Sequence, residues 1–187
     1  MGEPVERISY AEYLERREAS EVRLEWLDGV VYAMSGGTVE HARLSAAAVG
    51  ELRTALRAHG CAVFSADLAI RVEATDRTTY ADAVVVCGPE TVSPSDQHAV
   101  TNPTIIVEVL SPSTEASDRG EKFRHYQRLE SLREYVLISQ GDPTIEVFER
   151  QGNAWLLRTY GAGDSFVLSS QDVEISVDAI YADARRT

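Results

Sequence analysis

The chain has 187 residues, of which 44% are hydrophobic and 26% charged, and this is the usage of one ordinary globular domain with a sizeable core. The formal net charge of -12 counts against broad, non-specific adhesion to nucleic acid, which relies on a basic surface. A local basic groove stays compatible with that charge.

The cysteines and the N-terminus bear on where the protein works. Cys61 and Cys87 lie far apart without a second pair, so their spacing indicates neither a zinc site nor a disulfide framework. A reduced, cytoplasmic setting is the simplest interpretation. The first ten residues lack the apolar stretch of a signal peptide, and no later segment approaches the roughly 20 apolar residues that span a bilayer. We therefore expect a soluble, intracellular protein.

Local patterns predict the elements in chain order. They are a helix over 9–20, a hairpin over 22–36, a helix over 38–60, strands over 61–72 and 80–88, a loop with some short local structure over 88–103, a strand over 104–110, a helix over 113–129, strands over 134–139, 144–150 and 154–160, and a strand with a short helix over 170–184. A capping box at Ser9 and Glu12 opens the first helix, and Asp28-Gly29 is a common hairpin turn. This order predicts a mixed central sheet flanked by helices, α/β or α+β in class, in a single domain over 1–187.

Two acidic residues interrupt strands that otherwise suit full burial. Asp82 enters the apolar run after Tyr80, and Glu108 stands in the middle of "TIIVEVL". Side chains alternate between the two faces of a strand, so each acid lies on a defined face. The two carboxylates can therefore converge if the two strands are neighbours. Paired carboxylates repel and require a shared proton or a cation, for which Mg²⁺ with its oxygen ligands is the natural choice. The alternative is that each acid sits at a strand end and meets an arginine or a backbone amide.

The helix after this strand adds an amine. Lys122 is the single lysine among 18 basic residues, and Tyr126 follows it on the same helical face. Lysine is a compact point charge that suits a site beside a phosphate, whereas arginine is a wide fork. The alternative interpretation is an exposed ion pair between Asp118 and Lys122, one turn apart.

Several segments, in this order and with these gaps, resemble one known family. They are "RLEWLDG", "MSGGTVEHARL", "YADAVVV", "IIVEVLSPST" and "DRGEKFRHYQRL". Together they are similar to the Uma-two family of endonucleases, which has the restriction-endonuclease-like PD-(D/E)XK fold. The resemblance covers residues 10–149, most of the chain, and "VEVLSPST" followed by "EKFRHY" is its most specific part.

The resemblance implies which residues form the site. Asp82 takes the place of the first acid of the motif and Glu108 that of the second. Ala81 replaces a proline of the family pattern, which removes a rigid turn but no ligand. Leu110 stands where the general motif has its lysine, and Lys122 matches a lysine moved to the following helix.

Further residues also match the family. Glu25 corresponds to an early acid often found at such sites, and His41 to a recurrent histidine on the second helix. Tyr126 is expected to hydrogen-bond a ligand carboxylate, and His41 to contact phosphate, both as supporting residues. The other three histidines show no metal-ligand spacing.

The implied activity is metal-dependent hydrolysis of phosphodiester bonds in nucleic acid, DNA above all. Asp82, Glu108 and the Val109 carbonyl would hold Mg²⁺ or Mn²⁺, which would polarise a phosphoryl oxygen and lower the pKa of a water molecule. Lys122 would orient that water or stabilise the developing charge, and Glu25 would bind a second metal or a water.

Other functions and partners stay open from the sequence. A catalytically silent module of the same fold that binds nucleic acid or a protein partner is the main alternative, and a carboxylate-pair glycosidase is a weaker one. Nucleic acid would need a basic cleft, for which the candidates are Arg43, Arg119, Arg124 and Arg128. The apolar segment 154–160 is a candidate homodimer interface.

Overall fold

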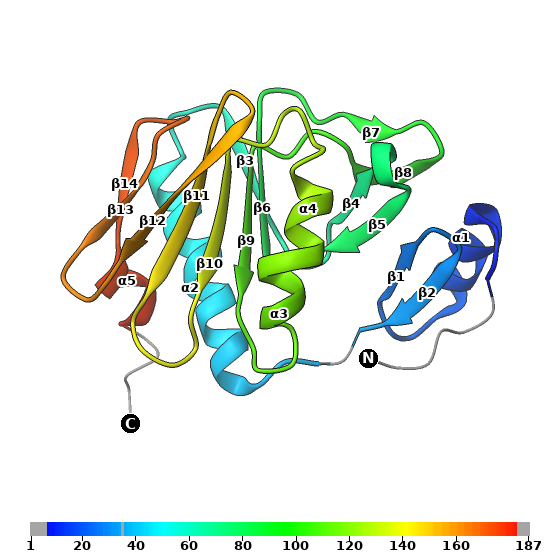
Figure 1. Cartoon of the computed structure of the whole chain (residues 1–187), viewed down its shortest axis with the longest axis horizontal. Coiled ribbons are helices and arrows are strands. Elements are labelled where there is room, and N and C mark those ends of the chain that lie inside the picture. Colours follow the sequence, from blue (N-terminus) through cyan, green and yellow to red (C-terminus); the bar gives the residue numbers. More distant parts are fainter. Residues whose placement is uncertain (1–6, 35, 183–187) are drawn as a thin grey trace.

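The structure, a computed structural model, describes residues 7–34 and 36–182 and has two six-stranded mixed sheets with a few helices (Figure 1). The first sheet has the order β2-β1-β5-β4-β8-β7, with β1 (Leu24–Leu27), β2 (Val30–Ala33), β4 (Ala69–Val72), β5 (Arg77–Tyr80), β7 (Val92–Ser93) and β8 (Asp96–Val100). The second has the order β12-β11-β10-β9-β6-β3, with β3 (Cys61–Ser65), β6 (Ala83–Cys87), β9 (Ile105–Val109), β10 (Glu134–Ile138), β11 (Ile145–Gln151) and β12 (Ala154–Tyr160).

The helices and one further hairpin complete the fold. They are α1 (Tyr10–Ala19), α2 (Val39–Ala55), a 3-10 turn (Glu73–Thr75), α3 (Glu115–Ser117), a π-helical segment (Asp118–Lys122), α4 (Phe123–Tyr126), α5 (Val177–Tyr181), and the hairpin of β13 (Ser165–Leu168) and β14 (Val173–Ser176). α1 begins at the predicted capping box, in which Ser9 and Glu12 bond each other's backbone. Asp28 and Gly29 both have positive φ, as the tight turn between β1 and β2 requires.

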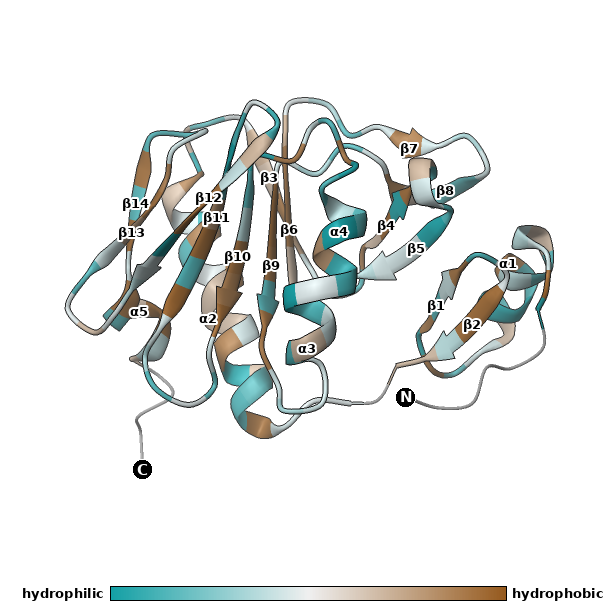
Figure 2. Cartoon of the chain, in the orientation of Figure 1, coloured by the Kyte–Doolittle hydropathy of each residue, from teal (hydrophilic) through white to brown (hydrophobic). Residues whose placement is uncertain are grey.

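The second sheet is covered on both faces. α2 lies against one face, where Leu44 and Leu52 join a core with Val85 and Val107, and the α3–α4 segment lies against the other (Figure 1). β6, β9 and β10 are therefore largely hydrophobic in Figure 2, because a strand with two covered faces has no solvent side. The position of Glu108 in the middle of such a strand has to be explained by its neighbours.

The mixed α+β class is confirmed, whereas several elements differ from the prediction. The expected single sheet is two sheets, and the short local structure expected in the loop over 88–103 consists of β7 and β8. β13 and most of β5 were not predicted, because segments of four residues give little local signal and gain strand structure by pairing with neighbours. Residues 183 and 184 of the last predicted segment lie outside the described residues, as does Ser35 of the predicted hairpin.

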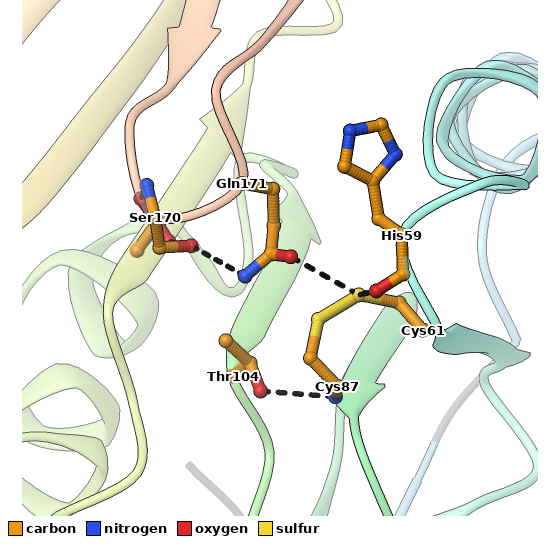
Figure 3. The surroundings of a disulfide bond; sticks show 7 residues. His59, Cys61, Cys87, Thr104, Ser170 and Gln171 are labelled. Atoms are coloured by element: carbon orange, nitrogen blue, oxygen red, sulfur yellow. Dashed lines mark hydrogen bonds between the residues drawn. A yellow bond between two sulfur atoms is a disulfide. The ribbon is translucent and has the colours of Figure 1, made fainter.

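The spacing of the two cysteines did not indicate a disulfide, and this prediction was wrong. Cys61 and Cys87 are directly opposite in the antiparallel ladder of β3 and β6 and form a disulfide with their Cα atoms 4.0 Å apart (Figure 3). Strand pairing brings together two residues that are 26 positions apart in the sequence. The cysteines therefore no longer support a reducing setting, and a cytoplasmic location stays a prediction.

Every helix in residues 7–34 and 36–182 is too short or too polar to cross a membrane.

Candidate active site beside β6 and β9

Asp82 and Glu108 are brought to adjacent strands of the second sheet. β6 pairs antiparallel with β9, with Ala83 opposite Val107, and Asp82 immediately precedes this ladder. The backbone N–H of Val109 donates a hydrogen bond to Oδ2 of Asp82 over 2.7 Å. Asp82 and Glu108 line the same cavity, as the alternation of the two strands predicts.

Glu108 is buried and is held by the α3–α4 segment. Nζ of Lys122 lies 2.7 Å from Oε1 of Glu108, and the hydroxyl of Tyr126 donates to the same oxygen over 3.0 Å. The side chains of Glu108 and Lys122 are 5% and 9% exposed, so this is a buried ion pair. The structure therefore brings the predicted amine and the predicted tyrosine to the second acid.

Asp118 belongs to the same group of charges, although the sequence indicated an exposed ion pair at most. Its side chain is 5% exposed, and its Oδ1 lies 3.8 Å from Nζ of Lys122. Both residues lie in the π-helical segment, a local distortion that occurs often at functional sites. The spacing of Asp118, Lys122 and Tyr126 by four residues was the available signal, but spacing on a helix does not reveal which face is buried.

Burial determines the ionisation of this group. Burial raises the pKa of Glu108 well above its usual range. The negative charges of Asp118 and Asp82 also raise this pKa, whereas Lys122 acts to lower it. Burial also opposes the charge of Lys122, but Glu108, Glu25 and Asp118 outweigh it and raise its pKa. Lys122 is thus a fixed positive charge among several carboxylates.

His41 reaches Asp82 from α2, the helix on the opposite face of the sheet. Its Nε2 lies 3.3 Å from Oδ2 of Asp82, and this hydrogen bond raises the pKa of His41, with the Val109 carbonyl acting in the same direction. A Cβ added at Gly37 would come within 2.9 Å of the imidazole ring, so only glycine fits there without displacing the ring. His41 is therefore a positioned, readily protonated group on the cavity wall.

Glu25 lies on β1 and is not in the described lining of the cavity, and its expected role at a second metal or a water stays a prediction. Its Oε1 accepts hydrogen bonds from the Thr79 hydroxyl and, over 3.3 Å, from the backbone N–H of Tyr80. Its Oε2 lies 3.6 Å from Arg77. The described residues that line the cavity do not include Glu25, so it acts on Lys122 through its charge.

The cavity beside these residues has a volume of about 510 Å³. Its polar wall comes from the acids, Lys122, His41 and the hydroxyl side chains of Ser45, Ser111, Ser113 and Thr114. The prediction that Arg43, Arg119, Arg124 and Arg128 line the cleft was wrong for this cavity. Arg43 and Arg119 instead pair with acids outside it, Arg43 with Glu40 over 3.4 Å and Arg119 with Glu115 over 2.8 Å. Arg23 is the only arginine among the described lining residues.

The carboxylates have the chemistry that a hard divalent cation requires. Protein donors converge on Oδ2 of Asp82 and on Oε1 of Glu108, and the other oxygen of each group has no protein partner among residues 7–34 and 36–182. In the same residues, no three His, Cys, Asp or Glu side chains are grouped to hold a metal ion together. A cation here would use two carboxylates and rely on other oxygen atoms and water, which is a usual arrangement for Mg²⁺.

Comparison with known proteins gives a family match over most of the chain. The family model described as "Uma2: Putative restriction endonuclease" matches residues 10–179. "Uncharacterized protein slr1290" of Synechocystis sp. (strain ATCC 27184 / PCC 6803 / Kazusa) is 35% identical over 179 residues, covering 95% of this chain and 93% of the relative. "Uncharacterized protein sll1609" of the same organism is 30% identical over 151 residues, covering 80% and 85%.

A solved structure has a similar fold. It is the crystal structure of "a putative nuclease belonging to DUF820" from Anabaena variabilis ATCC 29413, with a TM-score of 0.75 and 15% sequence identity. The similarity covers 94% of this chain and 98% of that one. At this identity the comparison supports the fold.

Proposed function

Because the chain belongs to the Uma2 family of restriction endonucleases, we propose that it is a nuclease that hydrolyses phosphodiester bonds of nucleic acid, DNA above all, with a divalent metal ion. The single observation that carries the proposal is the group of half-buried Asp82 with the buried ion pair of Glu108 and Lys122 on the wall of one cavity. Each of the two acids keeps one oxygen without a protein partner among the described residues, and the buried amine of Lys122 lies 2.7 Å from Glu108.

We assign the metal site to Asp82 and Glu108, with the Val109 carbonyl as a further oxygen donor. Mg²⁺ or Mn²⁺ held there would polarise a phosphoryl oxygen and lower the pKa of a water molecule. Asp82 is kept in place by the backbone N–H of Val109, and Glu108 by Tyr126. These contacts hold the two carboxylates in one orientation before substrate arrives.

We assign electrostatic roles to the cations of the site. Lys122 stays protonated and therefore stabilises negative charge that develops on the phosphate, or orients the attacking water. His41, on the other side of Asp82, is suited to contact a phosphate oxygen. Asp118 and Glu25 keep Lys122 charged.

A nicking assay tests the proposal. Purified protein with Mg²⁺ or Mn²⁺ is expected to nick supercoiled DNA, and Asp82→Ala, Glu108→Ala and Lys122→Ala are each expected to abolish nicking. Glu90→Ala, at an exposed position away from the cavity, is the matched control and should nick like the wild type. The isosteric Glu108→Gln variant, checked by thermal unfolding, separates lost chemistry from lost folding. Equal nicking by all the variants would indicate a contaminating nuclease and contradict the proposal.

The second candidate is a silent module that binds nucleic acid or a protein partner. Its support is that no group of three metal-binding side chains is found in the described residues. Isothermal titration with Mn²⁺ separates the two functions, because only the nuclease requires binding that depends on Asp82.

A homodimer through the edge strand β12, where Leu156 and Leu157 are exposed, also stays a prediction and is measured by light scattering.

A further inference from the structure

A second cavity of about 320 Å³ adjoins the candidate active site. The two cavities share a wall formed by Glu21, Val22, Arg23 and Tyr80. Beyond this wall the second cavity is lined by Arg17, Asp67 and His98, among others. The two cavities therefore lie next to each other, with Arg23 in the lining of both.

Among the cations in the described lining of the active-site cavity, only Arg23 is paired with an exposed acid. The active-site cavity carries Glu21, Asp82, Glu108 and Asp118, and Lys122 is already paired with Glu108. A nucleic acid strand carries one negative charge per phosphate, so it has to be met by a cation at the entrance. Arg23, on the shared wall, has the required position and charge.

The partner of Arg23 is an exposed carboxylate. Nη2 of Arg23 lies 2.7 Å from Oδ1 of Asp67, and the two side chains are 46% and 80% exposed. An exposed ion pair of this kind contributes little to stability, so the partner of Arg23 can be exchanged. Carboxylate and phosphate offer the guanidinium group the same two-oxygen geometry.

The second arginine of this region shows the contrast. Arg17 makes two hydrogen bonds to Asp96, of 2.7 and 2.9 Å, and the two side chains are 12% and 1% exposed. This pair is fixed by the fold and is not available to a ligand. Of the two arginines that line these cavities, Arg23 is therefore the one that can exchange its partner for a ligand.

From this arrangement, and resting on the nuclease function proposed above, we propose that Arg23 binds a backbone phosphate next to the one that is cleaved. Asp67 holds the guanidinium group at the shared wall until the strand displaces it. The contact involves no base, so it contributes affinity without sequence preference.

Steady-state nicking in Mg²⁺ tests this assignment with Arg23→Gln and the matched control Arg43→Gln. Arg43 is 45% exposed and paired with Glu40, like Arg23 with Asp67, but it lies outside both cavities. Arg23→Gln is expected to raise KM about tenfold with kcat within about twofold, and to reduce the salt dependence of binding by about one phosphate contact. Asp67→Asn should lower KM, because it removes the competitor of the phosphate. Equal KM values for the Arg23 and Arg43 variants would overturn the assignment.

A binding measurement in EDTA distinguishes this inference from the proposed chemistry. A fluorescent DNA oligonucleotide is titrated with wild type, Arg23→Gln and Arg43→Gln where metal-dependent cleavage does not proceed. Weaker binding by Arg23→Gln alone supports the phosphate contact even if the wild type proves unable to nick. Identical binding curves, or no binding by the wild type, would overturn it.

Discussion

Glu108 and Asp96 are both buried carboxylates that contact a largely buried cation. Glu108 lies in the second large sheet and Asp96 in the first, and they are held in different ways. Asp96 receives two hydrogen bonds from Arg17, one from the Tyr10 hydroxyl over 3.1 Å and one from the backbone N–H of His98 over 3.0 Å. These bonds engage both of its oxygens. Glu108 receives Lys122 and Tyr126 on a single oxygen.

The pKa shifts of the two acids have opposite signs for this reason. Burial acts to raise the pKa of Asp96, but the hydrogen bonds from Arg17 and His98 outweigh it and lower that pKa. Burial dominates at Glu108 and raises its pKa. A carboxylate with hydrogen bonds on both oxygens, such as Asp96, stabilises the fold. A carboxylate with partners on one oxygen and a raised pKa, such as Glu108, lowers the stability of the fold when ionised and is suited to bind a ligand.

The largest effect that separates the two acids is expected in stability. Asp96→Asn removes the charge that compensates the largely buried Arg17, and we expect it to lower the free energy of unfolding by about 3 kcal/mol while nicking is retained. Glu108→Gln should cost less stability and abolish nicking. Chemical denaturation and the nicking assay measure both quantities. If the two variants lost stability equally, the contrast between the sites would be wrong.

The pH dependence of stability should differ in sign. The lowered pKa of Asp96 contributes stability that is present above its ordinary value of 3.8 and is lost as the pH falls through the folded-state pKa. The raised pKa of Glu108 makes its ionisation oppose folding, so a penalty grows as the pH rises from 4.5 through the folded-state pKa.

Denaturation at a series of pH values compares each variant with the wild type. The advantage of the wild type over Asp96→Asn should increase as the pH rises toward 3.8. Its stability relative to Glu108→Gln should decrease as the pH rises above 4.5. Parallel curves for the two variants would contradict the opposite shifts.

The smallest expected effect is the titration of His41. The hydrogen bond from His41 to Asp82 raises its pKa above 6.5, so its stabilising contribution is full below pH 6.5 and is lost as the pH rises through the folded-state pKa. Asp82→Asn should return the midpoint toward 6.5, as measured by NMR of the histidine ring. His125, whose pKa is lowered by burial and by Arg77, is the internal control and should not move. An unchanged His41 midpoint would show that Asp82 does not hold the ring.

Much of the candidate site could be predicted from local patterns. A charged residue inside an apolar strand is costly, so the positions of Asp82 and Glu108 indicated a partner or a function before any contact was known. Helical spacing placed Tyr126 and Lys122 on one face, and the resemblance to the family added His41. The capping box, the hairpin turn and α2 also depend on residues close together in the chain.

The amino-acid sequence by itself determined the elements with strong periodicity and the identity of the acids and the amine, because these depend on neighbours within a few residues. Only the tertiary structure decided that Asp118 is buried, that Cys61 meets Cys87, that the strands divide into two sheets, and that Arg23 rather than Arg43 lies on the cavity wall. Burial and pairing arise from contacts between distant segments. The residues of a local pattern do not indicate which distant segment will pack against them.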